Sequence, residues 1–511
     1  MSQAASLPLL VAIPLGTAFI LPVFHRMKRS AAVADFISAT AAGALLIITI
    51  SLLGVDRQVY WAGNWNPARL IGIALYADGL SKLLLLIINL VSLAVVLFSI
   101  QYMARYTSRI LYFSLFMLMI AGMNGVVITG DMFNLFVFLE IASIASYALV
   151  AFGCESEELE ASFKYLILGS IASTFVLFGI GILYNQTGFL NMAQLSEHFQ
   201  VAGMSRAAIM AACFFIVGFG LKGAMVPFHA WLPDAHPSAP APISAMLSGV
   251  LIKALGIYAL ARLFLNVFPV SNAFAVVLML LGAVSMLIGV LMAVGQWDFK
   301  RLLAYHSISQ MGYVVLALGI GLGVVSRGGS DIVAGLALFG ALFHLFNHSA
   351  FKSLLFLSSG SIEYATGTRQ LKEMGGLRKR MPVTGVCCRI ASFSIAGIPP
   401  FNGFFSKLVI IIAAFQAGHP WLAALAVLVA FLTLVSFLKV QTYALDGELP
   451  ERYRNVKEVP AAMGLGMAIL AVVCVAAGIL FLRSPLAGMI MEPARDALLK
   501  TSDYARLVLG G

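Results

Sequence analysis

Two lysines lie inside apolar stretches of the chain that are long enough to cross a membrane. Lys222 ends the run GFGLK and Lys253 lies in GVLIKALG, while Pro227 and the proline-rich segment PDAHPSAPAP separate them. A charged side chain at membrane depth costs about 2.5–3.5 kcal/mol on insertion scales, so it indicates a function by default. Irregular backbone at that depth is tolerated only where it is buried in protein or lines a wet cavity. The pattern predicts an ion path around a broken helix; the alternative is a lysine that reaches the interface from a helix end. The other titratable residues of the turn are expected to face water: His229, Asp234 and His236.

A carboxylate lies in another apolar stretch. Glu140 stands in FVFLEIASIA, with apolar residues on both sides. A buried carboxylate is either neutralised or paired, and Lys222 is the predicted partner. Close to the carboxylate the ammonium form of the lysine is favoured, and separation of the two groups lets the lysine release its proton. A purely structural ion pair is the alternative, because such pairs also perturb pKa values.

Three titratable residues recur at intervals of four in FHLFNHSAFK. His344, His348 and Lys352 therefore share one face of a helix. Histidine, with an ordinary pKa of about 6.5, can pass protons in either direction, so the stripe predicts a proton relay. A metal site is the alternative, but it needs a further ligand and a carboxylate that the neighbouring sequence does not supply. His306, in LLAYHSISQ, is expected to lead into the same line.

A second broken helix is predicted in SIAGIPPFNGFFSK, where Lys407 follows a Gly/Pro break. This segment lies five predicted spans after the break that follows Lys222. Interrupted helices at corresponding positions of two halves indicate a transport site built on inverted repeats. Because the offset is odd, the two repeats have opposite orientations in the membrane.

The composition is that of a polytopic membrane protein. Of the 511 residues, 61% are hydrophobic and 11% charged, and the mean hydropathy is +0.97, whereas about a quarter of the residues of a soluble domain are charged. The five cysteines form no CxxC pair, so iron–sulfur, zinc and c-type haem sites lack ligands. No cofactor and no metal are expected, and any redox chemistry belongs to a partner. The net charge of +10 is attributed to loops of a membrane protein and not to nucleic-acid binding. The first apolar run lacks a basic n-region and is interpreted as a span, not as a signal peptide.

Apolar runs of about 20 residues predict an all-α protein with about fourteen transmembrane helices. It contains two inverted five-helix repeats, each with a broken helix. The expected spans are 7–24, 33–54, 79–102, 110–129, 131–152, 162–184, 207–226, 242–265, 273–295, 303–324, 332–358, 383–416, 421–444 and 460–482. The predicted organisation is 1–109 N-terminal helices, 110–265 first repeat, 273–445 second repeat, and 446–511 C-terminal helix and tail.

The basic residues of the connections predict the orientation. Alternate connections, starting after the first span, carry fifteen Lys and Arg, and the opposite set carries four. Basic loops remain on the cytoplasmic side, which places both termini outside a cell (inner) membrane. The segment ESEELE, residues 155–160, is an acidic exception on the cytoplasmic side.

Five motifs carry a family resemblance: VPFHAWLPDAHPSAPAPISAMLSGVLIKALGIYAL, LEIASIASYALV, DFKRLLAYHSISQMGY, FNHSAFKSLLFLSSG and AGIPPFNGFFSK. They resemble the antiporter-like subunits shared by respiratory complex I, Mrp-type Na⁺/H⁺ antiporters and membrane-bound hydrogenases. The resemblance extends from about residue 75 to 445. It implies that Glu140 pairs with Lys222, that Lys253 is the central link and that Lys407 leads to the outer side. It also assigns His344, His348 and Lys352 to the path.

The hypothesis from the sequence is a proton-translocating subunit of a multisubunit energy-converting complex. The short tail and Lys407 resemble the D-type Mrp subunits or their hydrogenase relatives more than the complex I subunits. Other membrane subunits, the lipid bilayer and H⁺ are the expected partners. The alternatives are a subunit that exchanges Na⁺ or K⁺ for H⁺, a stand-alone solute permease, and a quinone-binding enzyme.

Overall fold

The computed structural model describes residues 6–26, 30–55, 57–64, 72–106, 108–483, 485–500 and 503–509. Its helices are α1 (Leu9–Ile20), α2 (Ser30–Leu53), α3 (Gly79–Tyr102), α4 (Arg109–Ile128), α5 (Met132–Val150), α6 (Ser156–Thr187), α7 (Met192–Ala202), α8 (Arg206–Lys222), α9 (Leu232–Ser238), α10 (Ala241–Met246), α11 (Tyr258–Arg262), α12 (Asn272–Val294), α13 (Phe299–Ser326), α14 (Asp331–Thr366), α15 (Pro382–Ala396), α16 (Asn402–Gln416), α17 (Pro420–Val440), α18 (Ala461–Arg483), α19 (Glu492–Leu499) and α20 (Asp503–Leu509).

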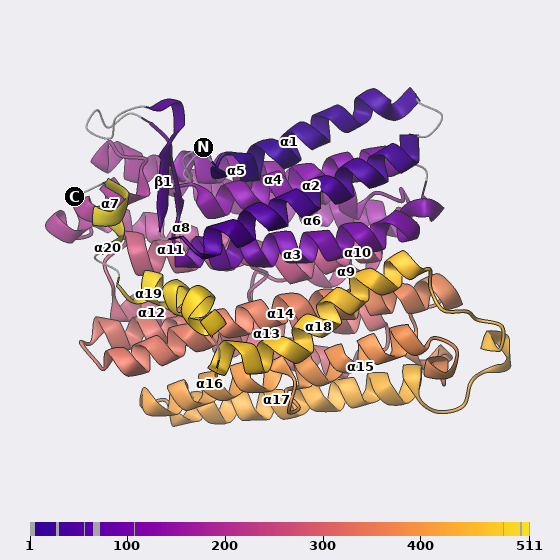
Figure 1. Cartoon of the computed structure of the whole chain (residues 1–511). Helices are drawn as coiled ribbons and strands as arrows, with labels where there is room; N and C mark the ends of the chain where they lie inside the picture. Colours follow the sequence, from indigo (N-terminus) through magenta and orange to yellow (C-terminus); the bar gives the residue numbers. More distant parts are fainter. Residues whose placement is uncertain are drawn as a thin grey trace.

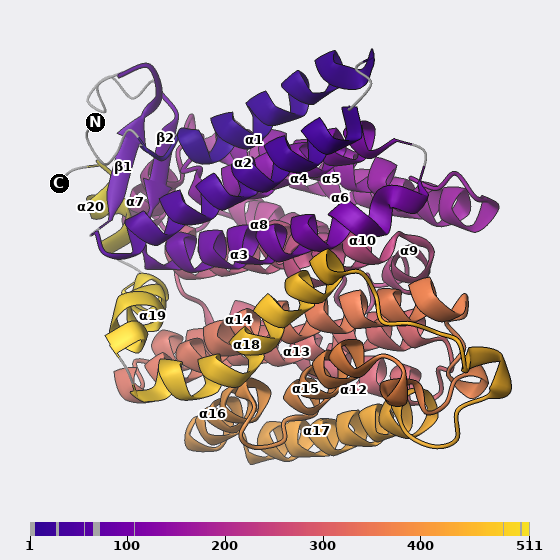
Figure 2. The ribbon, with the colours of Figure 1, turned by 45° about the vertical axis from the view of Figure 1, so that its right-hand side comes forward.

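The helices form one bundle of roughly parallel rods, with both chain ends at the same end of the bundle (Figure 1). We call this the terminal end and the other the loop end. Helices from the first part of the chain occupy one half of the bundle and most of those from the second part the other, while α20 lies beside α7 in the first half (Figure 1). α18 crosses obliquely on the surface in both views (Figures 1 and 2) and packs against both α3 and α14. It therefore fastens the two halves together.

The expected number of spans agrees with the structure. Within the described residues, twelve helical segments are long and apolar enough to cross a membrane. The two remaining expected spans are the broken ones, α8 with α9 and α15 with α16. The prediction of an all-helical membrane fold with two broken helices is confirmed. An antiparallel hairpin at the terminal end, β1 (Gln58–Trp61) with β2 (Ala74–Ala77), was not anticipated.

Each break follows from local sequence. α8 ends at Lys222 with Gly223 as its cap, and helical geometry resumes only at Leu232. α15 ends at Gly397, whose φ of +82° is left-handed and suits glycine because no Cβ clashes there. Helical geometry resumes at Asn402. The two breaks leave carbonyl groups at the ends of α8 and α15 without helical partners.

The span that contains α10 and α11 departs from α geometry without breaking. It runs over Ala241–Val267 and contains π-helical turns at Leu247–Leu251, Lys253–Ile257 and Leu263–Val267. We call it the α10–α11 span; its most apolar stretch is entirely buried within the protein. π-helical turns are rare and occur frequently at functional sites.

The acidic segment 155–160 belongs to a helix and not to a loop, because α6 begins at Ser156. Acidic residues stabilise a helix N-terminus through the helix dipole. Arg369 and Lys164 also contact acidic side chains of this segment, Glu157 and Glu160 respectively. Local charge pairing thus explains the exception to the basic loops.

The basic residues counted in predicting the orientation include Lys28, Arg29 and Arg69. These three lie outside the described residues.

The α10–α11 span packs closely on the first break, which gives a test of the fold. A Cβ on Gly256 would lie 2.5 Å from the backbone nitrogen and Cα of Gly223. We expect Gly256→Ala to lower the thermal unfolding midpoint of the detergent-solubilised protein, since overpacking typically costs about 1–3 kcal/mol. Gly181→Ala is the matched control, because a Cβ there meets nothing within 4 Å. Equal midpoints for the two variants would show that this contact is not needed.

Candidate functional site

The first charged cluster joins α5, α6 and α8. The Lys222 Nζ lies 3.7 Å from Glu140 Oε1 and donates hydrogen bonds to Ser143 Oγ at 2.8 Å and Tyr147 Oη at 3.3 Å. The Ser173 hydroxyl donates to Glu140 Oε1. The structure thus brings the predicted pair together. Because each charged group also has neutral partners, the two can move apart without either losing all its hydrogen bonds.

The two members of this pair differ in burial. The Lys222 side chain is 3% exposed and that of Glu140 is 28% exposed. Glu140 lies on a helix whose neighbouring exposed side chains, Phe133, Val137 and Ile144, are apolar. In this chain alone, a carboxylate is therefore partly uncovered on an apolar face.

The central lysine is fully buried and is held by its own helix. Lys253 Nζ donates to the carbonyl oxygens of Ser248 at 2.8 Å and Gly249 at 2.6 Å. From Ser248 the contacts continue to α13, because its hydroxyl lies 2.7 Å from that of Ser307. The Ser307 hydroxyl donates to the Leu303 carbonyl.

The same Leu303 carbonyl accepts a hydrogen bond from the Lys352 amine of α14. Lys253 and Lys352, which lie on different helices, are therefore linked by the carbonyl and the hydroxyl of Ser248, the hydroxyl of Ser307 and the carbonyl of Leu303. No residue in this chain of contacts is exposed to solvent. This connection was not predicted from the sequence, since neither serine stands out in an apolar helix.

The α14 stripe continues this line toward the second break. His344, His348 and Lys352 are all fully buried, and the two imidazole centroids lie 6.5 Å apart. His344 Nδ1 lies 3.0 Å from the hydroxyl of Ser406, whose neighbour in the chain is Lys407. The three stripe residues thus lie together along one helix, as expected, and reach α16.

Lys407 lies beside the second break, as predicted. Its Nζ donates to the Ile395 carbonyl at 2.6 Å, one of the carbonyls that the end of α15 leaves without a helical partner. The amine also lies 5.3 Å from the ring centroid of Tyr313, a favourable place for a cation. The two break lysines differ in one respect: Lys222 ends the arm before its break, whereas Lys407 lies in the arm after its break.

His306 lies near the line but makes its main contact elsewhere. It is fully buried on α13, and its ring packs against Phe437 of α17 at 5.0 Å. The expected role of His306 as a feeder to the line stays a prediction.

Many polar atoms along the line have no protein partner among the described residues. They include both ring nitrogens of His306 and His348, Nε2 of His344, the side-chain amide of Gln310 and that of Asn402. Buried polar groups in folded proteins are almost always hydrogen-bonded, and water often supplies the partner. We therefore expect internal water next to these side chains, which is the medium that proton transfer between them requires.

Two buried groups were missed by sequence reasoning. Arg262 and Asp78 form a bidentate pair with distances of 2.6 and 2.8 Å, close to the terminal end. The signal was present, because Arg262 interrupts the apolar run YALARLFL, but only lysines were considered there.

His236 was expected to face water, which was wrong: it is fully buried on α9. From the sequence, a short helix rich in proline is interpreted as a turn. The burial of His236 comes from contacts with segments that are distant in the chain.

The described part of the chain contains no group of three or more His, Cys, Asp or Glu side chains that could hold a metal ion. The site residues from Lys253 to Lys407 are instead mainly buried lysine, histidine and serine side chains.

Comparison with known proteins identifies the family. Residues 129–433 match the family described as NADH:quinone oxidoreductase/Mrp antiporter, TM, and residues 68–113 match the NADH-ubiquinone oxidoreductase (complex I), chain 5 N-terminus. The chain belongs to this family of antiporter-like membrane subunits. The resemblance seen in the five sequence motifs is thereby confirmed.

Relatives from different complexes are similarly close. The D-type subunit of the Na⁺/H⁺ antiporter of Alkalihalophilus pseudofirmus is 36% identical over 454 residues, covering 88% of each chain. The N-type subunit of the NADH-quinone oxidoreductase of Desulforudis audaxviator is 35% identical over 501 residues, covering 93% of this chain and 96% of that one. A chain in the structure of the Mrp complex from a Dietzia species matches with a TM-score of 0.90 and 29% identity, over 100% of both chains.

The α14 stripe gives a prediction that separates a proton relay from a metal site. His348→Ala should slow proton transfer through the assembled complex by roughly a hundredfold, within the range of lost acid–base groups. Zn²⁺ or a chelator should leave the wild-type rate unchanged. His198→Ala, on the amphipathic helix α7, is the control. Stoichiometric metal retained through purification, and lost together with activity, would contradict the relay.

Proposed function

We propose that this chain conducts protons across a cell membrane as an antiporter-like subunit of a multisubunit energy-converting complex. The observation that carries the proposal is the row of buried lysines and histidines in the middle of the bundle. Hydrogen bonds and a contact between two serines link Lys253 to Lys352. The two histidines of α14 follow on the same helix, 6.5 Å apart, and His344 contacts Ser406, the residue before Lys407. Isolated buried lysines are costly, and a row of them joined by serines and histidines has an evident use in proton transfer.

In the proposed path, the proton moves between Lys222, Lys253, the α14 stripe and Lys407 through internal water. Glu140 controls the first step electrostatically. When its carboxylate is near, the ammonium form of Lys222 is stabilised; when the two separate, Lys222 gives up its proton to the centre of the protein. His306 would feed the same line, and Lys407 would release the proton toward the outer side.

Residues 110–265 and 273–445 would act as two inverted units of this path, each contributing one broken helix. The N-terminal helices of residues 1–109 and the segment 446–511 would pack on the outer surface of these two units. With basic loops in the cytoplasm, the loop end faces inward and both termini lie on the outer side of the membrane.

Other membrane subunits are the expected neighbours. The relatives in the comparison are by name subunits of larger complexes, and the Dietzia match is part of one. The partial exposure of Glu140 on an apolar face supports the same conclusion for this chain, because a carboxylate in contact with lipid is unfavourable. A neighbouring protein packed on α5 would cover it.

Exchange of Na⁺ or K⁺ for H⁺ is the second candidate, supported by the name of the relative from Alkalihalophilus pseudofirmus. It makes a different prediction about cation flux. Proton movement in reconstituted complex that requires no Na⁺ or K⁺ on either side would exclude it, whereas coupled movement of labelled Na⁺ would favour it over pure proton conduction.

The Glu140–Lys222 pair provides the test of the proposal. Glu140→Ala and Lys222→Ala should each reduce proton translocation by roughly a hundredfold, within the range of lost acid–base groups, while the protein still inserts and assembles. Glu140→Asp keeps the charge but shortens its reach, so an intermediate rate is expected.

The measurement is the rate of pH change in vesicles that contain the complex, normalised to assembled protein. Glu160→Ala is a matched control, because Glu160 lies on the exposed surface of α6 with 69% of its side chain accessible. Wild-type rates in both pair variants would remove the pair from the mechanism.

A further inference from the structure

An apolar groove lies between α15 and α18, which pack against each other in the second half of the bundle (Figure 2). We call it the α15–α18 groove. It has a volume of about 630 Å³, and none of the side chains that line it is charged. Residues between 382 and 390 form one wall and residues between 468 and 476 form the other.

The ridges of this groove are open to the outside of the bundle, whereas its floor is closed. Val386 of α15 and Val472 of α18 are 54% and 65% exposed. Cys387 and Ala471, which also line the groove, are buried. In a membrane, an open apolar face of this kind is in contact either with lipid chains or with another protein.

The length of the groove favours a lipid chain over a spanning helix. Its walls run from residue 382 to 390 and from 468 to 476, and eight residues of α-helix span about 12 Å. The hydrocarbon core of a bilayer is about 30 Å thick, so the groove is confined to one leaflet. Toward the terminal end α16 covers α18, because a Cβ on Gly478 would lie 2.8 Å from the Phe405 ring. A spanning helix in the groove would therefore meet α16 halfway across the membrane.

Basic side chains stand at the loop-end mouth of the groove. Lys379 and Arg380 directly precede the first turn of α15, and both are exposed. Lys457 is also exposed, and its neighbour Glu458 accepts a hydrogen bond from the backbone N–H of Val383 at 2.7 Å. Because Val383 lines the groove, both basic segments reach its mouth.

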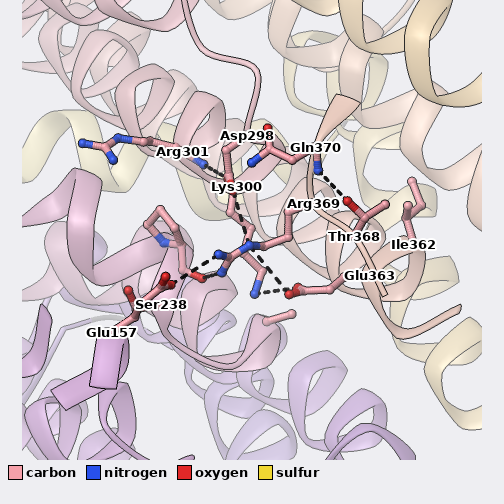
Figure 3. A network of polar contacts seen from close by, with 12 residues as sticks. Glu157, Ser238, Asp298, Lys300, Arg301, Ile362, Glu363, Thr368, Arg369 and Gln370 are labelled. Atoms are coloured by element: carbon pink, nitrogen blue, oxygen red, sulfur yellow. Dashed lines mark hydrogen bonds and ion pairs between the residues drawn. The ribbon is translucent and has the colours of Figure 1, made fainter. Parts of the chain in front are cut away.

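Other basic residues at the loop end have carboxylate partners. Lys300 and Arg369 lie among the carboxylates of Glu157, Asp298 and Glu363 (Figure 3). Four arginines of the two segments that flank the mouth are also paired, in Arg378–Asp446, Arg389–Asp446, Arg452–Glu373 and Arg454–Glu451.

The three basic residues at the mouth are different. Within the described part of the chain, no carboxylate forms an ion pair with Lys379, Arg380 or Lys457. Glu458 lies beside them, but its two oxygens accept hydrogen bonds from the backbone of Val383 and the hydroxyl of Thr384. Its charge is thus directed at the N-terminus of α15, which favours an anion. The mouth keeps a positive charge that the protein itself does not compensate.

We propose that the α15–α18 groove binds one anionic phospholipid. An acyl chain lies between the two helices, and the phosphate lies among Lys379, Arg380 and Lys457. The apolar slot and the basic mouth match the two parts of such a lipid, and basic pockets between membrane helices are typical sites for anionic headgroups. The inference goes beyond the proposed function and does not depend on proton conduction.

Two simpler explanations decide how the test is built. Basic loops also fix the orientation of a membrane protein, and any lipid of the surrounding bilayer can fill an apolar groove. The experiment must therefore compare an anionic with a zwitterionic lipid at this one place.

Photolabelling makes that comparison. The complex that contains this chain is reconstituted in phosphatidylcholine vesicles with a trace of phosphatidylglycerol or of phosphatidylcholine, each with a diazirine on one acyl chain. After illumination, the labelled peptides are mapped. A basic residue near a membrane surface favours an anionic lipid by roughly fivefold, so labelling of 382–390 and 468–476 should be at least about tenfold stronger with phosphatidylglycerol.

Charge and shape are then tested separately. The combined change Lys379→Gln, Arg380→Gln and Lys457→Gln should bring the ratio of the two labels close to that of the bilayer, and it leaves the buried helices untouched. Arg206→Gln is the matched control, because Arg206 is an exposed arginine at the start of α8; it should keep the wild-type ratio. Ala468→Phe, which fills the groove from α18, should abolish labelling of both walls.

The outcomes are decisive in each case. Equal labelling by the two lipids in the wild type overturns the proposal, because the groove then holds bilayer lipid without selecting its headgroup. Absence of label from both walls in the assembled complex also overturns it, since another protein then covers the groove. A preference that survives the triple substitution does the same, because the basic mouth is then not the headgroup site. None of these results affects the Glu140–Lys222 test of the proposed function.

Discussion

The structure depends on holding ammonium groups inside a bundle from which bulk water is excluded. An amine at membrane depth is stable only if backbone or side-chain oxygens replace its water. Lys253 uses carbonyls of its own helix next to π-helical turns, and Lys407 uses a carbonyl at the end of α15. Regular α-helix occupies its carbonyls with internal hydrogen bonds. The breaks and π-helical turns therefore supply the carbonyl groups that bind the lysines. The elements around them keep those breaks buried.

This constraint also explains why the line is useful. A lysine bound only by neutral oxygens can lose its proton without leaving a charged partner behind, whereas the bidentate Arg262–Asp78 pair has no such freedom because arginine stays protonated. The two kinds of site lie in the same α10–α11 span. Lys253 faces the serines that lead to α14, and Arg262 locks the end of the span to α3. The bundle thus has a paired arginine near one end, and lysines bound by neutral carbonyls in its middle.

The sequence predicted the membrane helices and their two breaks. Apolar runs of sufficient length indicate the helices, and Gly and Pro indicate the breaks. The partners Glu140 and Lys222 were inferred from their charges and from the family resemblance, and the 3.7 Å separation agrees. Serines such as Ser248 and Ser307 could not be predicted, since their contact depends on how two helices are rotated against each other. His236 was misjudged for a related reason: its burial arises from α14, more than a hundred residues away in the chain. Local pattern shows which residues are costly to bury, but only packing shows what surrounds them.

The claim that buried lysines hand on protons is tested most directly at Lys407, by proton pumping of the reconstituted complex normalised to assembled protein. If the lysine must release its proton, Lys407→Arg should fail by roughly tenfold or more, because arginine keeps its proton, with a pKa above about 12. Lys407→Gln should fail equally, and Lys407→Glu, which can also bind and release a proton, should retain part of the rate. Full activity with arginine would contradict the account, since the site would then need only a positive charge.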